Sequence, residues 1–560
     1  QAGGVGAITG DFNTVVGRSA AYNATGMNRS TFLGYFAGGL GVVNSASNTC
    51  VGAVAGYSLS SGASNVLIGD GAGLYLTAGG DNIVIGHGAM DAADTATARN
   101  SCIAIGTGAL GGQTSAVSRC VAIGHNALIL QNANVQNTVI GGLAGDAITN
   151  GGGNTLVGYL AGSAVSSSAD NTAVGHNAFN TGTGAENTMI GSAAGRSATG
   201  NDNVCVGRLA GGGLTSGTGN TLLGKSAGAN MSSSSDYNVA IGFQALTSLA
   251  TTSHNNIAIG TNALYTQSTD QSGGSITDGS ATSIAIGRNA LYTQNSADGI
   301  NLAIGYTAGD AITTGTQNVL IGHEAGSTLA ASATDTGDNC TAVGYGALKL
   351  ATGARNTAFG FNAGVAVAAG INNTILGGNA MVDADGGESD NVAIGYAALA
   401  RLDNDASDGN VAVGRDAGRY YNDGGSNTSL EQAANCVLIG NLARTSRDDA
   451  DNQIVIGYNA LGIGNNSIAL GDTNIGAIKG QVDFAAYSDR RIKRDITNDD
   501  TGLASIEKLQ PVTFKFVNSA DYPDEIAVSV YKESTTEELV TPAVEAADEV
   551  WEDAIVQEAR

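Results

Sequence analysis

The pentapeptide Asn-Val-Ala-Ile-Gly at residues 391–395 decides the fold, because variants of it recur along most of the chain. Other copies are Asn-Thr-Val-Val-Gly at 13–17, Asn-Val-Leu-Ile-Gly at 65–69 and Asn-Thr-Ala-Val-Gly at 171–175. When the copies are aligned on the glycine, 26 of them lie between Gly17 and Gly471, and their 25 intervals average about 18 residues. A period of this length is typical of a solenoid, in which each repeat forms one turn of a stack.

The three residues before the glycine predict a short strand. The last of them is always large and apolar, as in Ile394, the middle one is apolar, and the first is nearly always Thr, Val or Ile. An apolar run that is rich in β-branched residues and too short for a helix indicates a strand buried on both faces. A solenoid made of one chain buries only the inward face of such a strand. The outward face therefore requires the same strand of neighbouring copies, arranged around an axis.

Two further columns of the repeat predict how each turn is closed. The glycine marks the corner, since glycine adopts positive φ without strain, and Ala three residues later, present in 25 of 26 copies, marks a close approach of backbones. Asn four residues before the glycine predicts a ladder of side chains that bond to the corner backbone. The Gly-Gly-x-Gly-x-Asp pattern of calcium-binding solenoids does not occur, and we expect neither a metal site nor a cofactor.

Composition supports a hydrogen-bonded β structure and narrows the range of partners. The chain has 84 Gly and 3 Pro, and every Pro lies after residue 489. Proline cannot donate to a β-ladder, whereas collagen would require abundant proline and Gly at every third position. A net charge of −25 disfavours nucleic acid and anionic membranes as partners. No apolar run approaches the ~18 residues of a transmembrane helix, so membrane insertion is not expected.

The cysteines and histidines follow the same columns. Four cysteines replace the Asn of the ladder and two lie in the apolar column, namely Cys102, Cys120, Cys340 and Cys436, and Cys50 and Cys205. Without Cys-x-x-Cys spacing a zinc site is improbable, and the cysteines are predicted to be small buried hydrophobes, with interchain disulfides as the alternative. Four of the five His directly follow the corner glycine, in a column rich in Tyr, Phe and Arg. Packing at the corner is the favoured interpretation of this column, and a sugar-binding stripe is the alternative.

Long intervals between the glycines predict inserted loops. The two longest follow Gly260 and Gly414, and they contain Tyr265 and the pair Tyr420 and Tyr421. Binding residues tend to lie on loops that a rigid scaffold holds in place. These three tyrosines are therefore candidate binding residues for a receptor, although simple tolerance of insertions explains the loops equally well.

The repeat resembles the head domain of trimeric autotransporter adhesins, a left-handed β-roll, and similar repeats of phage and viral fibres. The resemblance covers residues 13–471. It implies that the solenoid assembles as a homotrimer. We therefore expect an elongated all-β solenoid of about 26 short turns over residues 1–480, homotrimeric, followed by a small α+β domain over residues 481–560.

The run Ser-Asp-Arg-Arg-Ile-Lys-Arg-Asp-Ile at 488–496 lies where the rhythm has stopped. Together with the Leu/Pro/Phe pattern that follows, it resembles the start of the endosialidase-type intramolecular chaperone (peptidase S74-like) at the C-terminus of phage tailspikes and fibres. In that family the domain trimerises the growing fibre and releases itself by cutting after the Ser of the Ser-Asp pair. The resemblance implies at most a single-turnover autoproteolytic enzyme, and the solenoid itself is not expected to be an enzyme.

The resemblance also assigns roles to five residues. Ser488 would be the nucleophile, Lys493 the base that activates it, and the bond between Ser488 and Asp489 the one that is cut. Arg491 and Asp495 would support them. The pair is chemically sensible, because a partly desolvated Lys has a lowered pKa and can accept the hydroxyl proton.

The sequence as a whole favours a structural and adhesive fibre of a phage or other virus, located on the virion. Its expected partners are copies of itself, a glycan or protein receptor on the host surface, and a base or tail protein of the virion. A trimeric adhesin or filament of a bacterial or other extracellular surface is one alternative. A tailspike glycan depolymerase is another, and it would need paired carboxylates in an aromatic-lined groove.

Overall fold

A computed structural model describes residues 9–478, apart from gaps at 41–42, 93–98, 114–116, 134–135, 232–233, 250–253, 268–281, 295–299, 314, 330–336 and 423–426. The chain divides into two units, Gln1–Gly476 and Ala477–Arg560. All described residues but two belong to the first unit, and the fold is that of this unit. The expected α+β domain at 481–560 lies outside the described residues, as do Ser488, Asp489, Arg491, Lys493 and Asp495.

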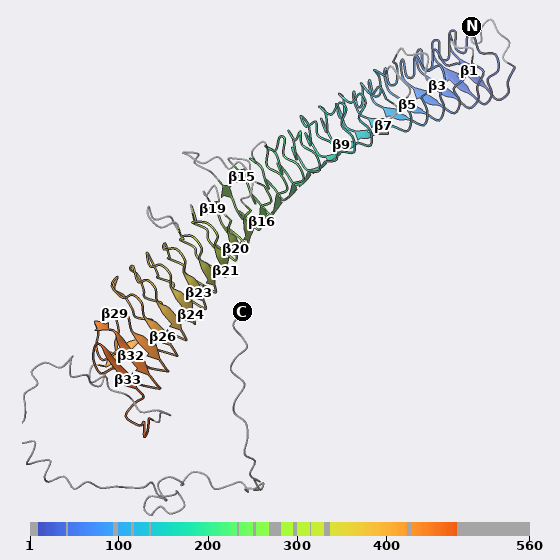
Figure 1. The fold of residues 1–560 in the computed structure, drawn as a ribbon. Helices are drawn as coiled ribbons and strands as arrows, with labels where there is room; N and C mark the ends of the chain where they lie inside the picture. Colours follow the sequence, from blue (N-terminus) through green and yellow to red (C-terminus); the bar gives the residue numbers. More distant parts are fainter. Residues whose placement is uncertain are drawn as a thin grey trace, which may run out of the picture. The chain divides into compact units, whose positions relative to one another are not determined.

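The described part of the chain is a solenoid of short strands without a helix, which confirms the predicted all-β solenoid (Figure 1). Its main sheet has 26 strands, and each copy of the motif supplies one of them. These strands are β1 (Thr14–Val16), β2 (Thr31–Leu33), β3 (Thr49–Val51), β4 (Val66–Ile68), β5 (Ile83–Ile85), β6 (Ile103–Ile105), β7 (Val121–Ile123), β8 (Thr138–Ile140), β9 (Thr155–Val157), β10 (Thr172–Val174), β11 (Thr188–Ile190), β12 (Val204–Val206), β13 (Thr221–Leu223), β14 (Val239–Ile241), β16 (Ile257–Ile259), β18 (Ile284–Ile286), β20 (Leu302–Ile304), β21 (Val319–Ile321), β22 (Thr341–Val343), β23 (Thr357–Phe359), β24 (Thr374–Leu376), β25 (Val392–Ile394), β26 (Val411–Val413), β30 (Val437–Ile439), β32 (Gln453–Ile456) and β33 (Ser467–Leu470).

Three smaller sheets accompany the main one. The parallel strands β15 (Ser248–Leu249), β17 (Thr266–Gln267) and β19 (Thr293–Gln294) form the first. The antiparallel pair β27 (Tyr420–Asn422) and β28 (Asn427–Ser429) forms the second, and the parallel pair β29 (Ala433–Ala434) and β31 (Ala450–Asp451) the third.

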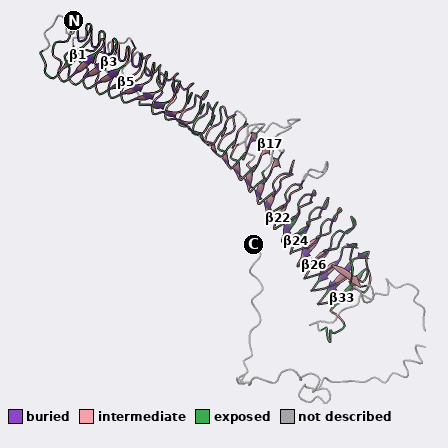
Figure 2. Ribbon diagram, turned by 180° about the vertical axis from the view of Figure 1, so that it is seen from behind, coloured by how far each residue is buried: buried purple, intermediate pink, exposed green. Residues whose placement is uncertain are grey.

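Strands of the main sheet pair in parallel, and equivalent columns of the repeat lie opposite each other. In the pair β12 and β13, for example, Cys205 lies opposite Leu222 and Val206 opposite Leu223. The central residue of each strand points into the turn, so Leu222 is completely buried whereas Leu223 is 44% exposed. Buried residues recur from turn to turn along the stack in Figure 2. The pairing of equivalent columns thus sets a register in which one face of the strands is in the core, even where turns differ in length.

The core is filled by complementary pairs of small and large residues. The position after the conserved Ala is usually Gly or Leu, and it has positive φ in every turn from Ala21 to Gly418, whereas Arg444 and Leu461 do not. Where the central strand residue is the large Phe32, this position is Gly38, and a Cβ there would lie 2.4 Å from the Phe32 ring. Where the central residue is Ala104, the position is Leu110, which is fully buried. Turns of these two kinds therefore reach close packing with one large side chain in either place.

The corner glycines have the positive φ that the sequence predicts. Gly224, for example, has a φ of 137°. A Cβ on it would lie 2.4 Å from the carbonyl oxygen of Gly242, the corner glycine of the next turn. Glycine is thus required twice at each corner, for the backbone conformation and for the close approach of the next turn.

The predicted Asn ladder is confirmed. Its buried members are Asn48, Asn65, Asn82, Asn137, Asn154, Asn171, Asn187, Asn203, Asn220, Asn238, Asn256, Asn301, Asn318, Asn356, Asn373, Asn391 and Asn410. The Asn203 side chain donates to the backbone carbonyl of Gly217 at 2.9 Å, and its Oδ1 accepts the backbone N–H and the side-chain amide of Asn220, both at 3.0 Å. The ladder therefore satisfies polar backbone groups inside the stack, where water cannot.

All six cysteines are buried thiols, as predicted. Burial raises the pKa of Cys50 and of Cys205 to about 12, which leaves both protonated and unreactive at neutral pH. Cys340, which stands in the Asn column, donates from Sγ to the backbone carbonyl of Gly353 at 3.4 Å. A cysteine can therefore take over part of the hydrogen bonding of the Asn that it replaces.

Candidate functional site

Of the predicted site residues, the three loop tyrosines lie in the described part of the chain. Tyr265 precedes β17 and stacks on Tyr292, which precedes β19, with ring centroids 5.0 Å apart and planes 6° from parallel. Both rings are half-buried. The pair arises because Ala-Leu-Tyr-Thr-Gln occurs at 263–267 and again at 290–294, so that two turns have the same extension.

Tyr420 and Tyr421 lie in the hairpin of β27 and β28, which is inserted after β26. Arg419 lies over the Tyr420 ring, 5.0 Å from its centroid, and forms an ion pair with Asp416 at 2.7 Å. Tyr421 packs against the hydrophobic core. The structure therefore places the three tyrosines in two separate insertions along the stack and does not bring them together.

A second candidate surface is the column that directly follows the corner glycine. Tyr306, His323, Tyr345 and Phe361 stack on one another with centroid distances of 4.9, 4.9 and 5.3 Å and interplanar angles of 15–23°. The Arg288 guanidinium lies 5.5 Å from the Tyr306 centroid and continues the stack. Such offset or parallel ring pairs and cation–π contacts each stabilise the corner by about 1 kcal/mol. The favoured interpretation of this column, packing at the corner, is thus confirmed for these rings.

The outer face of the main sheet is apolar and exposed in the single chain. The residue before the corner glycine is large and at least one third exposed in many turns, namely Val16, Leu33, Ile68, Ile140, Ile190, Leu223, Phe359, Leu376, Ile439, Ile456 and Leu470. Scattered apolar side chains on a surface need no explanation, whereas a contiguous apolar face marks an interaction site. These residues follow one another along a 26-stranded sheet and therefore form one continuous interface candidate.

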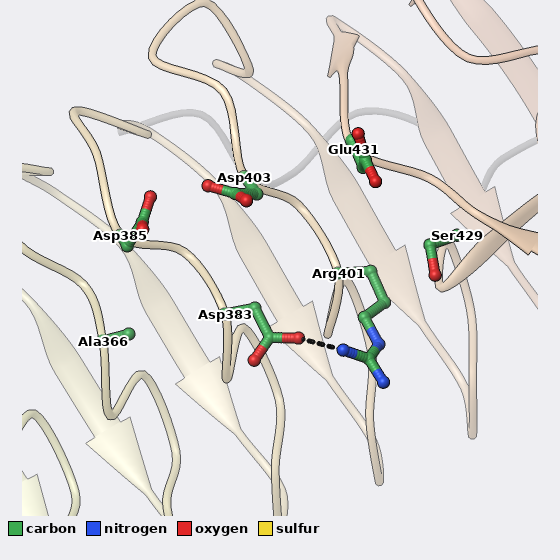
Figure 3. A pocket seen from close by; sticks show the side chains of 7 residues that line it. All are labelled: Ala366, Asp383, Asp385, Arg401, Asp403, Ser429 and Glu431. Atoms are coloured by element: carbon green, nitrogen blue, oxygen red, sulfur yellow. Dashed lines mark hydrogen bonds and ion pairs between the residues drawn. The ribbon is translucent and has the colours of Figure 1, made fainter.

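A polar pocket of about 360 Å³ lies between neighbouring turns near β28. It is lined by Ala366, Asp383, Asp385, Arg401, Asp403, Ser429 and Glu431, and Figure 3 shows Arg401 bonded to Asp383 at 2.7 Å. None of these described lining residues is aromatic, and they therefore do not form the sugar-stacking wall that a glycan depolymerase would need. Within the described residues no group of three or more His, Cys, Asp or Glu is arranged to hold a metal ion. Sequence reasoning missed this pocket, although Asp385 and Asp403 both lie eight residues after a corner glycine, Gly377 and Gly395, and this shared column could have placed them on adjacent turns.

Two carboxylates of the pocket are coupled. The neighbouring Asp385 raises the pKa of Asp403 from its ordinary value near 3.8 to about 6, because a protonated Asp403 donates a hydrogen bond to it and two adjacent negative charges repel. Between about pH 4 and pH 6, Asp403 is therefore still largely protonated in the folded state, whereas it is already ionised in the unfolded chain.

This coupling predicts a pH dependence. The contribution of Asp403 to stability is fully present below about pH 4, falls as the pH rises towards 6, and is lost once Asp403 is ionised. We expect Asp403→Asn to unfold at a higher urea concentration than wild type at pH 7, and the difference to shrink at pH 4.5. Urea titrations of both proteins at the two pH values measure this. An equal difference at both pH values would contradict the coupling.

Comparison with known protein families finds a match for one segment of the chain. The model of the chaperone of endosialidase, peptidase S74, matches residues 488–529. No curated protein and no solved structure matches the chain. The match begins at Ser488, at the head of the run that the sequence analysis related to the same family. The described residues contain no helix of the length and apolar character needed to cross a membrane.

Proposed function

We propose that this chain is the subunit of a homotrimeric fibre of a phage or other virus, which attaches the particle to its host. The exposed apolar face of the main sheet is the observation that supports this most directly, because it needs copies of the same strand to cover it. The similarity of residues 488–529 to the endosialidase chaperone supports assembly in threes. Three copies would set their apolar faces around a common axis, with the aromatic columns and the inserted loops available to other partners.

The experiment that tests the proposal has two parts. Native mass spectrometry of the Ser488→Ala chain, which should remain uncut, should give three times the 55.4 kDa of one subunit. Immunoelectron microscopy with antibodies against the solenoid should then label the fibres of virus particles. A stable monomer would refute the assembly, and labelling of bacterial surface filaments without particles would favour the alternative, an extracellular adhesin. Release of reducing ends from capsular polysaccharide would instead indicate a depolymerase.

The C-terminal domain is proposed to cut the chain once, after Ser488. Lys493 would take the proton of the Ser488 hydroxyl as its oxygen attacks the carbonyl carbon of residue 488 and forms an ester bond. The C–N bond to Asp489 would break, and Lys493 would return the proton to the leaving amine. One water would then hydrolyse the ester, which restores the hydroxyl and leaves a carboxylate on residue 488. We expect wild-type fibres to contain chains that end at Ser488, and Ser488→Ala chains to remain intact. Mass spectrometry of denatured fibres distinguishes the two. Ser519→Ala, a change within the same matched region, serves as the control and should be cut normally. Intact wild-type chains in mature particles would remove the proposed cleavage.

A further inference from the structure

Two glycines interrupt the aromatic column that follows the corner glycine, and both have an aromatic residue on the turn before and on the turn after. Gly378 lies between Phe361 and Tyr396, and Gly142 lies between His125 and Tyr159. At both places the column lacks a side chain for one turn. Elsewhere the column contains aromatic, charged or other side chains, and the turns around Gly378 include the stack that ends at Phe361.

The backbone does not require glycine at these two positions. At the preceding residue, the corner Gly377, φ is 145° and a Cβ would lie 2.3 Å from the carbonyl oxygen of Gly395. At Gly378 no positive φ occurs, and the nearest atom to an added Cβ is Cδ2 of Tyr396 at 3.6 Å, an ordinary contact. At Gly142 the nearest atom is Cδ2 of Tyr159 at 3.5 Å. The relevant property of glycine at these two positions is therefore that it has no side chain.

The missing side chain leaves ring faces open. Inside the uninterrupted stack, Tyr306 is 41% and Tyr345 is 47% exposed, because neighbouring rings cover their faces. The rings that border the glycines are more exposed, with 55% for Phe361, 51% for Tyr396 and 50% for Tyr159. These fractions differ only slightly from those inside the stack, and what distinguishes the two places is that the turn with the glycine supplies no side chain between the bordering rings.

The size of the opening matches one six-membered ring. Neighbouring turns of a sheet are ~4.8 Å apart, so the backbone positions of Phe361 and Tyr396, two turns apart, are separated by ~10 Å. The Tyr396 ring borders Gly378, where its Cδ2 would lie 3.6 Å from an added Cβ. A ring placed midway would have the spacing of 4.9–5.3 Å that the stacked rings of this column have. The Arg415 guanidinium lies 5.9 Å from the centroid of Tyr396. This contact helps to fix the orientation of the ring.

We propose that the opening at Gly378, and the equivalent one at Gly142, each bind one hexopyranose unit of a glycan between two aromatic rings. This inference rests on the proposed attachment function and names its ligand class. A pyranose has C–H groups on its two faces and hydroxyls around its edge. The opening has aromatic faces, which attract polarised C–H groups, on two sides, and the half-buried amides of Asn362 and Asn379 follow Phe361 and Gly378. An aromatic side chain of a protein receptor would leave these amides without a ligand hydroxyl.

The test fills the openings. Gly378→Tyr and Gly142→Tyr insert a ring that the same column already contains in other turns. Ser192→Tyr, which adds a ring to the same column between His176 and Arg208, is the matched control. The probe is an array of oligosaccharides built from glucose, galactose, mannose and N-acetylglucosamine. We expect wild type and the control to bind at least one hexose series, and the doubly filled variant to bind it at least ~10-fold more weakly, the value of one aromatic contact. Each singly filled variant should lose the binding of one opening and keep that of the other.

A second variant distinguishes loss of the binding site from misfolding of the filled variants. Tyr396→Leu keeps an apolar side chain but removes the ring face, and in the Gly142→Tyr background it should weaken the same interaction while the thermal unfolding temperature stays near that of wild type. Binding to none of the hexoses, or binding that survives both filling substitutions, overturns the proposed sites.

An assay of attachment to host cells distinguishes failure of the proposed sugar sites from failure of the proposed function. If wild-type fibres attach and the doubly filled variant attaches equally well, the fibre function stands and the sites are wrong. Attachment that persists after periodate oxidation of host glycans would indicate a protein receptor and would likewise overturn the sites. If wild-type fibres attach to no host, the proposed function itself fails.

Discussion

Gly224→Ala should destabilise the solenoid around its turn by more than about 3 kcal/mol. A φ of 137° is accessible to glycine and costs any other residue about 1–3 kcal/mol. The added Cβ would also lie 2.4 Å from the carbonyl oxygen of Gly242, a backbone atom that cannot move without breaking the pairing of β13 with β14. Strain and steric overlap therefore add.

Hydrogen exchange measured by mass spectrometry reports this effect locally, because a repeat array does not unfold in one step. Peptides that contain β13 and β14 should lose protection in Gly224→Ala. Gly378→Ala is the matched control, since its Cβ meets only a ring carbon at 3.6 Å. It should leave protection unchanged or raise it slightly by restricting the unfolded chain. Equal loss in the two variants would show that the corner conformation is not the cause.

The repeating columns explain why so much of the fold could be predicted from sequence. Each column samples the same environment 26 times, so the corner glycine, the strand and the Asn ladder were evident without coordinates. A strand residue such as Leu222 and its outward neighbour Leu223 look alike in one copy, and only the repeated pattern shows that both are required. The exposed outward face could also be predicted, because a solenoid made of one chain buries only the inward face of each strand.

Features that depend on two different columns could not be predicted. The exchange of Gly38 for Leu110 becomes meaningful only when the opposite partners, Phe32 and Ala104, are known to meet across the turn. Gly378 could not be singled out in a sequence with 84 glycines. The sequence does not distinguish a glycine that the backbone conformation requires from one whose role is to lack a side chain. Their distinction needs φ and the distance to the nearest atom.

Lysine substitutions on the outer face should separate the subunits. We expect the triple variant Ile190→Lys, Val206→Lys and Leu223→Lys to sediment as a monomer with its solenoid intact. These side chains lie on the adjacent strands β11, β12 and β13 and point away from the core, half-buried or exposed in the single chain. In a trimer they would face the axis, where nine unpaired ammonium groups each cost several kcal/mol to remove from water.

A second triple variant separates the effect of added charge from the effect of placing that charge on the outer face of the sheet. Ala53→Lys, Ser192→Lys and Thr261→Lys add the same three charges in the exposed column that contains Lys225 in the natural sequence. This variant should sediment as a trimer, because its lysines remain in water. Far-ultraviolet circular dichroism should be the same for both, since neither set of substitutions touches the core. An outer-face variant that still sediments with the control would mean that the apolar face of the sheet is not the interface between subunits.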